Sequence, residues 1–356
     1  MRKKREILAR VGSMEQLASV RPLTYEAGQA KGLRALELVN GPMRFSLLTD
    51  KALDIADFSY KGRTFHFLAK PGLLKQEAQE GKGEEAVRSV MGGLLFTSGL
   101  TNTCPACQID GVSYPIHGRM RNQAADHLSF ASYWQDDQYI LRASGEMREA
   151  CLFAENLVLQ RTITTTWGEK SFVLHDRIEN QGFREEGLML LYHINFGYPL
   201  LDEACEVCLP SRSVHVRDPE TRFAEANWSK GEAPIPGEPE YVFLHQLAAD
   251  DQGMVTCAIY NHELGLGMEL SYSAANLPRF MEWKSLASGD YVLAFEPTNS
   301  GPYGRAAEVG RGSLHLLPPG QSEENTLRFT VLEGEAEFQA SRSYINDCLS
   351  KHLNTP

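Results

Sequence analysis

The sequence predicts an all-β fold built mainly from antiparallel sheets. Segments in which apolar and polar residues alternate recur along the chain, and such alternation is typical of strands that bury one face. Short runs rich in Gly, Pro, Asn and Asp separate these segments, as expected for turns. Helical patterns are scarce and do not alternate with strands, which disfavours a parallel sheet. The expected strands include residues 44–50, 157–167, 171–180, 254–263, 267–273, 291–297 and 327–334.

The few helical signals lie in the first quarter of the chain. Ser13 precedes "MEQLASV", and a serine at this position is a favourable N-cap for a helical turn within 13–20. Residues 70–93 have room for one short helix, although the Gly-Lys-Gly sequence at 81–83 interrupts the pattern. Gly is unfavourable inside a helix, so we expect little helix in this region.

The strand expected at 157–167 shows how the faces are assigned. Leu157, Leu159 and Ile163 fall on one side of an extended chain, and Thr162 and Thr164 fall on the other, because successive strand residues point to opposite faces. β-Branched residues of this kind are favoured in strands. A sheet of such strands buries one face and is typical of a β-sandwich.

The stretch "LLYHINFGYPLL" at 190–201 alternates in the same way. Tyr192, Ile194, Phe196 and Tyr198 share the face expected to pack in the core, and His193 and Asn195 share the other. Two interpretations of that polar face remain open from the pattern alone. The histidine and the amide either face solvent as ordinary polar groups or line a pocket.

Two further polar residues occupy comparable positions at strand ends. In "GVSYPIHGRM" (111–120), His117 lies on the face opposite Tyr114, and in "YVLAFEPTNSGP" (291–302), Glu296 lies opposite Phe295. Both precede turn sequences, where a rigid sheet commonly presents side chains to a ligand. Two histidines and one carboxylate together could carry out acid–base chemistry near neutral pH.

The composition excludes several classes of protein. The formal net charge of −11 disfavours a nucleic-acid partner, because binding to phosphates requires concentrated Lys and Arg. No apolar run reaches the roughly 18 residues of a membrane-spanning helix, and the N-terminal segment has no apolar region typical of a signal peptide. The seven cysteines are therefore expected to be reduced thiols in the cytoplasm.

Several motifs resemble one known family and occur in its order. They are "RVGSMEQLASVRPLTYEAGQAKGLRALEL", "LLTDKALDIADFSYKG", "GGLLFTSGL", "YPIHGRM", "LYHINFGYPLL" and "FEPTN". The chain resembles an aldose 1-epimerase-like family of long-unassigned function, which is itself similar to the galactose mutarotases. The likeness covers residues 10–335. It implies a galactose mutarotase-like β-supersandwich that forms one domain over 1–356, with 1–12 and 340–356 peripheral.

The resemblance also selects three candidate catalytic residues. His117 in "IHG" matches a histidine–glycine motif that follows a strand in galactose mutarotases. His193 in "HINF" approximates a second histidine motif, and Glu296 in "FEPTN" matches a glutamate late in the chain. The arginine that precedes the first motif in mutarotases is missing here, and Arg119 is the candidate substitute. The substrate-binding aspartate has no secure counterpart.

Other residues are weaker candidates for contacts with a sugar. Trp283 could stack on a sugar ring and Lys284 could bind hydroxyl groups, although Trp is more often a core residue. Asn195 shares the polar face of His193, and Asp54 lies in the family-like "ALDI" motif, where a turn-capping role is the alternative. We include Arg119, Asn195, Trp283, Lys284 and Asp54 as candidate substrate-binding residues.

The sequence indicates no metal or cofactor. Cys104 with Cys107 and Cys205 with Cys208 form two C-x-x-C pairs, but i and i+3 point to opposite faces of a strand, and coincidence explains them better than zinc does. The favoured function is a cofactor-independent epimerase that opens a sugar ring at C1. The alternatives are an isomerase or epimerase acting beside a carbonyl, and a carbohydrate-binding protein without turnover. The expected partner is a small sugar of open identity, and a homodimer is one option for assembly.

Overall fold

The computed structural model describes residues 3–75, 83–218 and 227–353. Antiparallel strands dominate it, as the alternating pattern predicts. The larger sheet has the order β1 (Ser19–Thr24), β2 (Arg34–Val39), β3 (Met43–Leu48), β4 (Asp54–Tyr60), β8 (Leu95–Leu100), β16 (Met189–Phe196), β23 (Asp290–Thr298), β22 (Arg279–Ala287), β19 (Glu240–Leu247) and β18 (Ser211–Val216). A short strand, β5 (Arg63–Thr64), pairs with β4 at the side of this order.

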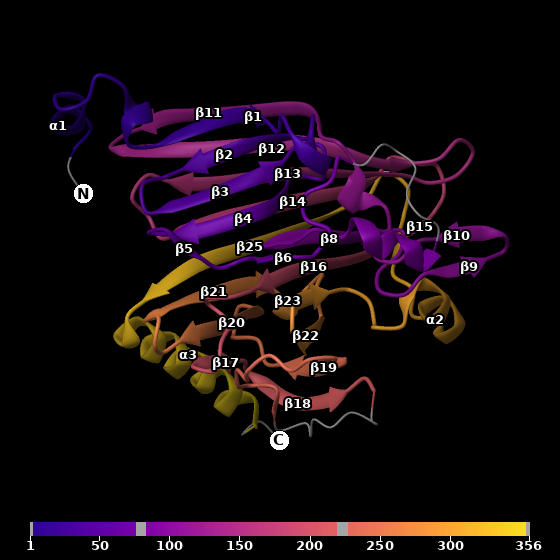
Figure 1. Ribbon diagram of the computed structural model, residues 1–356. Coiled ribbons are helices and arrows are strands. Elements are labelled where there is room, and N and C mark those ends of the chain that lie inside the picture. Colours follow the sequence, from indigo (N-terminus) through magenta and orange to yellow (C-terminus); the bar gives the residue numbers. More distant parts are fainter. Residues whose placement is uncertain (1–2, 76–82, 219–226, 354–356) are drawn as a thin grey trace.

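The second large sheet packs against the first. Its order is β11 (Asp126–Gln135), β12 (Gln138–Ala150), β13 (Asn156–Thr166), β14 (Ser171–Asn180), β25 (Ser322–Glu333), β21 (Leu266–Ser273), β20 (Met254–Asn261) and β17 (Cys205–Cys208). Figure 1 shows β1 to β4 lying over β11 to β14. Phe45 and Phe172 stack between the sheets with ring centroids 5.1 Å apart. The main hydrophobic core therefore lies between the two sheets.

The remaining elements are three two-stranded sheets and the helices, of which the longest in the described structure has 19 residues. Three small sheets pair β6 (Phe67–Leu68) with β7 (Gly92–Gly93), β9 (Cys107–Ile109) with β10 (Val112–Tyr114), and β15 (Glu186–Gly187) with β24 (Leu316–Leu317). The helices are α1 (Lys4–Leu8), α2 (Gly304–Arg311) and α3 (Glu335–Leu353), and the 3-10 helices are η1 (Met14–Gln16), η2 (Gly28–Ala30), η3 (Gly83–Ser89) and η4 (Met120–Asn122). Among the described residues, no helix is long and apolar enough to span a membrane.

The structure refines the predicted helices. Ser13 caps η1 as expected, because its side chain accepts a hydrogen bond of 3.2 Å from the amide of Glu15. Of the helix considered within 70–93, the structure has only the 3-10 helix η3, and residues 76–82 lie outside the described parts. The end segments expected to be peripheral contribute to the core, since Ile7 of α1 and Ile345 of α3 are both buried.

The strand β16 confirms most of the predicted facing and corrects one residue. Tyr192, Ile194 and Phe196 belong to the core cluster between the sheets. Tyr198 was expected to join them, but it is 72% exposed. The strand ends at Phe196, after which Gly197 hydrogen-bonds to the carbonyl of Phe65. The alternation therefore stops before Tyr198.

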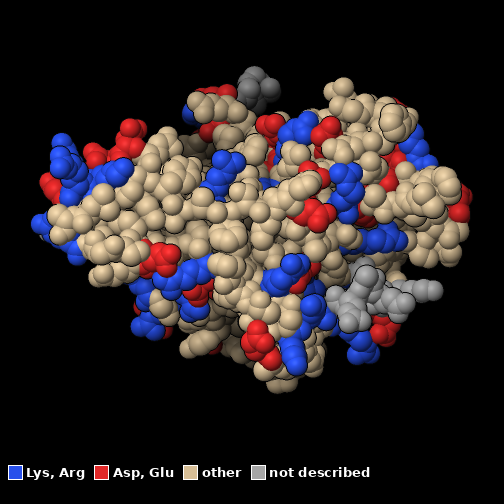
Figure 2. Space-filling model, turned by 90° about the horizontal axis from the view of Figure 1, so that it is seen from above, with Lys and Arg blue, Asp and Glu red and all other residues tan. Residues whose placement is uncertain are grey.

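Charged side chains of both signs are spread over the face of the molecule seen in Figure 2. Figure 2 shows Lys and Arg interspersed with Asp and Glu over the described part of the face seen from above. The acidic net charge of −11 is thus accompanied by mixed signs on this face. Mixed surface charge of this kind is typical of a globular protein surface.

Candidate active site

Strand pairing brings His193 and Glu296 together. In the antiparallel pair β16–β23, Ile194 lies opposite Phe295, and both are buried in the core. His193, which precedes Ile194, and Glu296, which follows Phe295, therefore both point to the other face of the sheet. There, His193 Nε2 lies 2.9 Å from Glu296 Oε1, and both side chains are only 6% exposed. Two residues about a hundred positions apart in sequence thus form one buried acid–base pair.

His117 reaches the same place from a loop rather than from a strand. It follows β10 with a positive φ of 57°, and its amide donates to the carbonyl of Cys104 at 2.9 Å. The next residue, Gly118, also has a positive φ, and a Cβ there would lie 2.3 Å from the carbonyl oxygen of Gly99. Only glycine fits so close to another backbone. The glycine of the "HG" motif therefore allows the turn that carries His117 to the site.

The environment of His117 favours its neutral form. Its Nδ1 lies 3.0 Å from Ser98 Oγ, and its ring is 5.6 Å from that of His193. Burial is the main factor that lowers the pKa of His117 well below its ordinary value, and the positive charges of His193 and Arg121 lower it further. A neutral imidazole can donate a hydrogen bond from one nitrogen and accept one at the other.

Aromatic and amide side chains surround His193. The ring of Phe96 stacks on it at 4.3 Å, and Trp283 lies perpendicular to it at 5.3 Å. Asn195 donates from Nδ2 to the backbone carbonyls of Gly93 and His193, both at 3.2 Å. Asn195 Oδ1 and His193 Nδ1 are buried and have no hydrogen-bond partner within the described parts of the chain. A buried polar atom of this kind needs a partner, so a bound molecule could supply one.

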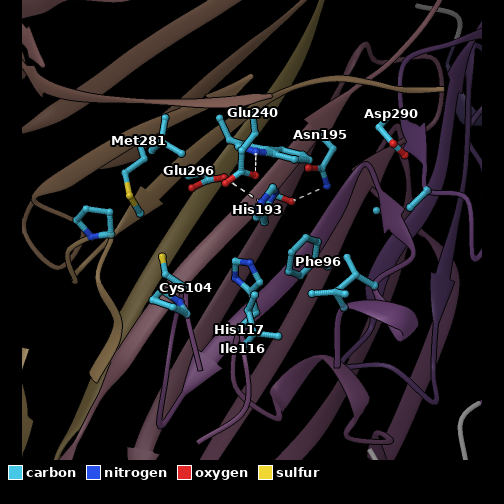
Figure 3. Close-up of a pocket in the computed structure, with 18 of the residues that line it drawn as sticks. Phe96, Cys104, Ile116, His117, His193, Asn195, Glu240, Met281, Asp290 and Glu296 are labelled. Atoms are coloured by element: carbon cyan, nitrogen blue, oxygen red, sulfur yellow. Dashed lines mark hydrogen bonds and ion pairs between the residues drawn. The ribbon is translucent and has the colours of Figure 1, made fainter. Parts of the chain in front are cut away.

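These residues line a cavity of about 800 Å³. Figure 3 shows His117, His193 and Glu296 directed toward a common space, with Cys104 and Met281 to one side and Asp290 to the other. Much of the remaining wall is apolar and includes Phe67, Ala69, Val87, Ile116 and Val242. A mostly apolar cavity with a few convergent polar groups is typical of a small-molecule site.

Several cavity residues were not predicted from the sequence. Glu240 accepts a 2.8 Å hydrogen bond from the indole of Trp283 and a 2.9 Å bond from Arg217. At another part of the wall, Lys70 Nζ lies 2.5 Å from Asp290 Oδ2. Glu240 and Asp290 begin their strands, and the alternation of β23 could have placed Asp290 on the face of Glu296. Lys70 and Arg217 lie outside the strands, where no periodic pattern assigns a face.

The structure corrects the expected role of Lys284. Trp283 lines the cavity, so its neighbour Lys284 on the same strand points to the opposite face. Lys284 is fully buried, and its ammonium donates to the backbone carbonyls of Asn227, Trp228 and Lys230. Burial lowers its pKa. The side chain anchors a loop and is not placed to bind a cavity ligand.

Asp54 also lies elsewhere. It is fully buried and contacts Arg161 Nη1 at 2.9 Å, and Arg161 in turn contacts Asp176 at 2.8 Å. Thr97 donates to Asp54 from both its amide and its hydroxyl. Asp54 is thus part of a buried network between the sheets and not a turn cap or a wall of the large cavity. Arg161 lies on the core face of β13, between Leu159 and Ile163; the alternation of 157–167 indicates that face, but it does not show which residue Arg161 pairs with.

Arg119 does not replace the missing arginine in the structure. Its guanidinium donates to the carbonyl of Ser113 at 2.6 Å and lies 3.7 Å from Glu149. It is not among the residues that line the cavity. Of the eight candidates, five therefore share the cavity, and they are His117, His193, Asn195, Trp283 and Glu296.

The cysteine pairs show no metal-binding arrangement within the described structure. All seven cysteines fall in its described parts and are free thiols. Across those parts, no group of three or more His, Cys, Asp or Glu side chains is arranged to hold a metal ion. Cys104 borders the cavity, and burial raises the pKa of its thiol. A neutral thiol of this kind is a weak nucleophile.

Comparisons with known proteins agree with this architecture. The model of the family described as "Domain of unknown function (DUF4432)" matches residues 30–331. No protein with a curated description matches the sequence. Solved structures do match, among them a protein of Klebsiella pneumoniae subsp. pneumoniae MGH 78578 provisionally described as an aldose 1-epimerase. It is 21% identical with a TM-score of 0.88, and the match covers 94% of this chain and 90% of that one.

Two further structures share the fold at lower identity. A galactose mutarotase-like protein from Clostridium acetobutylicum is 13% identical, with a TM-score of 0.58 over 89% of this chain and 99% of that one. A galactose 1-epimerase from Lactobacillus acidophilus NCFM is 12% identical, with a TM-score of 0.56 over 89% of this chain and 100% of that one. At these identities the likeness establishes the fold. The galactose mutarotase-like fold expected from the motifs is therefore confirmed.

Proposed function

We propose that this chain, which belongs to the DUF4432 family, is a cofactor-independent sugar epimerase that interconverts the anomers of an aldose. The observation that carries the proposal is the pair formed by His193 Nε2 and Glu296 Oε1, 2.9 Å apart at the wall of a cavity. A carboxylate and an imidazole so placed can move two protons on one small molecule. The names of the matching structures, which include aldose and galactose 1-epimerases, support the same assignment.

In the proposed reaction, Glu296 acts as the base and His193 as the acid. Glu296 takes the proton from the C1 hydroxyl, and the electron pair of that O–H bond forms the C1 carbonyl. The bond between C1 and the ring oxygen breaks, and the ring oxygen takes a proton from His193, which must start as the imidazolium. Rotation about the bond between C1 and C2 exposes the other carbonyl face. Reclosure with the two roles reversed then gives the other anomer.

His117 and Asn195 assist this step. His117, which is neutral, can hydrogen-bond to an oxygen of the ring without adding charge. The buried Oδ1 of Asn195 can accept a hydrogen bond from a sugar hydroxyl. Reclosure returns Glu296 to the carboxylate and His193 to the imidazolium. If the open-chain sugar leaves before reclosure, the proton can pass from Glu296 back to His193 directly, because the two side chains are in contact. The site is then reset without another base.

A cytoplasmic location belongs to the same proposal. It is supported by the seven cysteines, all of which are free and lie in the described parts of the structure. Free thiols are typical of proteins in reducing compartments. The proposed partner is a small sugar, because hydroxyl groups can pair with the convergent polar atoms of the cavity.

The direct test is acceleration of anomer exchange. Magnetisation-exchange NMR on a panel of free aldoses should show faster interconversion of α and β anomers with the enzyme than without it. Glu296→Gln keeps the shape of the side chain but removes the base, so the rate should fall by about 10²-fold or more. Glu333→Gln, on a partly exposed glutamate that pairs with Lys61 and accepts from Tyr60 outside the cavity, serves as the control and should retain the rate.

The same experiment separates the alternatives. Near-normal exchange in Glu296→Gln would contradict the assigned base. Entry of solvent deuterium at C2 would indicate proton transfer at carbon, and hence an isomerase or epimerase acting beside a carbonyl. Binding of a sugar without faster exchange would indicate a carbohydrate-binding protein.

A further inference from the structure

The cavity is longer than one sugar ring. Asp290 and Glu296 both line it and lie six residues apart on β23. An even separation places them on the same face of the strand, and at about 3.3 Å per residue their Cα atoms are about 20 Å apart. A pyranose built from bonds of about 1.5 Å measures only about 5–6 Å between opposite ring oxygen substituents. A single ring bound at Glu296 therefore leaves the Asp290 end unfilled.

The residues between the two ends lie in register across neighbouring strands. Trp283 on β22 is opposite Ala294, and Asn195 on β16 is opposite the same residue from the other side. This row lies two residues along the strands from the row that contains His193 and Glu296, and it lies on the side toward Asp290. Figure 3 shows Asn195 between Glu296 and Asp290. The cavity therefore continues from the acid–base pair, past Trp283 and Asn195, to Asp290.

The wall of this extension has the chemistry of a site for an uncharged polyol. Trp283, Phe67 and Ala69 offer apolar surface, and the C–H face of a sugar ring is apolar. Glu240 and Asp290 offer hydrogen-bond acceptors. Among the described lining residues, every Lys and Arg side chain contacts a carboxylate, and these pairs are Lys70 with Asp290, Arg88 with Glu85, and Arg217 with Asp218 and Glu240. Such paired charges suit hydroxyl groups better than a phosphate.

We propose that the preferred substrate is a reducing disaccharide. Its reducing ring lies at His193 and Glu296, and its second ring lies between Trp283 and the Lys70–Asp290 pair. This inference rests on the proposed epimerase function and adds the substrate class. The second ring contributes binding free energy away from the reacting carbon, which raises kcat/KM when it is realised in the transition state.

The test compares monosaccharides with disaccharides of the same sugar. Anomer exchange is measured by NMR for D-glucose, maltose and cellobiose, and for D-mannose and mannobiose. We expect kcat/KM to be at least about tenfold higher for at least one disaccharide than for its monosaccharide, which corresponds to about 1.4 kcal/mol. Comparable or lower values for every disaccharide would overturn the inference.

Variants locate the second ring. Asp290→Ala removes the partner of Lys70, and Ala69→Trp fills the extension with an indole; each should reduce the disaccharide advantage to less than about threefold. The matched control is Asp251→Ala, which breaks the exposed pair with Lys351 outside the cavity and should preserve the advantage. An advantage that survives both cavity variants would also overturn the inference.

The outcomes distinguish this inference from the proposed function. If monosaccharide anomers exchange faster but disaccharides gain nothing, the epimerase assignment stands and the two-ring site is wrong. If neither class is accelerated, the epimerase assignment fails and the two-ring site fails with it.

Discussion

His193 and Ile194 are adjacent in sequence but point to opposite faces of the sheet. We therefore expect substitution of Ile194 to reduce stability and substitution of His193 to reduce the rate of anomer exchange. Ile194 is fully buried between the sheets. Ile194→Ala removes three carbon atoms, worth about 0.8 kcal/mol each, and leaves a sealed void, so we expect a loss of about 2–5 kcal/mol of unfolding free energy. With a urea m-value of about 3 kcal/mol/M or more for a chain of this size, the unfolding midpoint should fall by roughly 1 M.

His193→Ala should behave in the opposite way. The histidine ring stacks on Phe96 but borders the cavity, so the vacated space joins a cavity that already exists and forms no new void. We expect a loss of less than about 1.5 kcal/mol, because the void penalty of a core substitution does not apply and because water in the enlarged cavity can solvate the carboxylate of Glu296, which loses its partner. Anomer exchange should fall by about 10²–10⁴-fold.

Both variants are tested in two assays. Urea unfolding is monitored by tryptophan fluorescence, and anomer exchange is measured by NMR. Ile194→Val removes a single methylene from the core and serves as the control. It should lower the free energy of unfolding by only about 0.5–1.5 kcal/mol. A larger midpoint shift in His193→Ala than in Ile194→Ala would refute the reasoning. His193 would then be a structural core residue, and the acid–base pair would lose its proposed role.

Three further predictions concern protonation, metals and the buried network. The lowered pKa of His117 means that the unfolded chain binds more protons just below pH 6.5. Stability should therefore fall as pH drops from 7 to 5, by up to about 1.4 kcal/mol per pH unit from this group, and urea midpoints of His117→Gln should show a shallower fall. Exchange activity should survive exhaustive EDTA treatment, because Glu296 and His193 supply both protons; loss on chelation and recovery with Zn²⁺ would contradict this mechanism. Asp54→Ala leaves Arg161 buried with one carboxylate partner fewer and should cost about 3–5 kcal/mol; an unchanged urea midpoint would argue against a structural role.

The sequence predicted the centre of the candidate site better than its wall. His193 and Glu296 could be assigned to the polar faces of their strands because alternation fixes the face of every residue. The same argument should have separated Trp283 from Lys284, since adjacent strand residues cannot both face one cavity. Arg217 and Lys70 could not be predicted, because loop residues carry no periodic signal that assigns them to a face.

Buried charges were the other limit of the prediction. Asp54 was a candidate for sugar binding because its motif resembles the family, but its partner Arg161 lies more than a hundred residues away in the chain. A buried carboxylate is stable only with such a partner. Sequence shows that both residues exist and does not show that they meet.

The sequence by itself determined the all-β class and which face of most strands is buried, because these follow from local alternation and the cost of exposing apolar side chains. Tertiary structure decided that β16 lies beside β23, that Gly118 lets His117 turn toward them, and that the cavity extends to Asp290. Strand pairing joins segments about a hundred residues apart, and its free energy comes from contacts between them. No property of either segment alone specifies those contacts, so the site becomes visible only when the sheets are assembled.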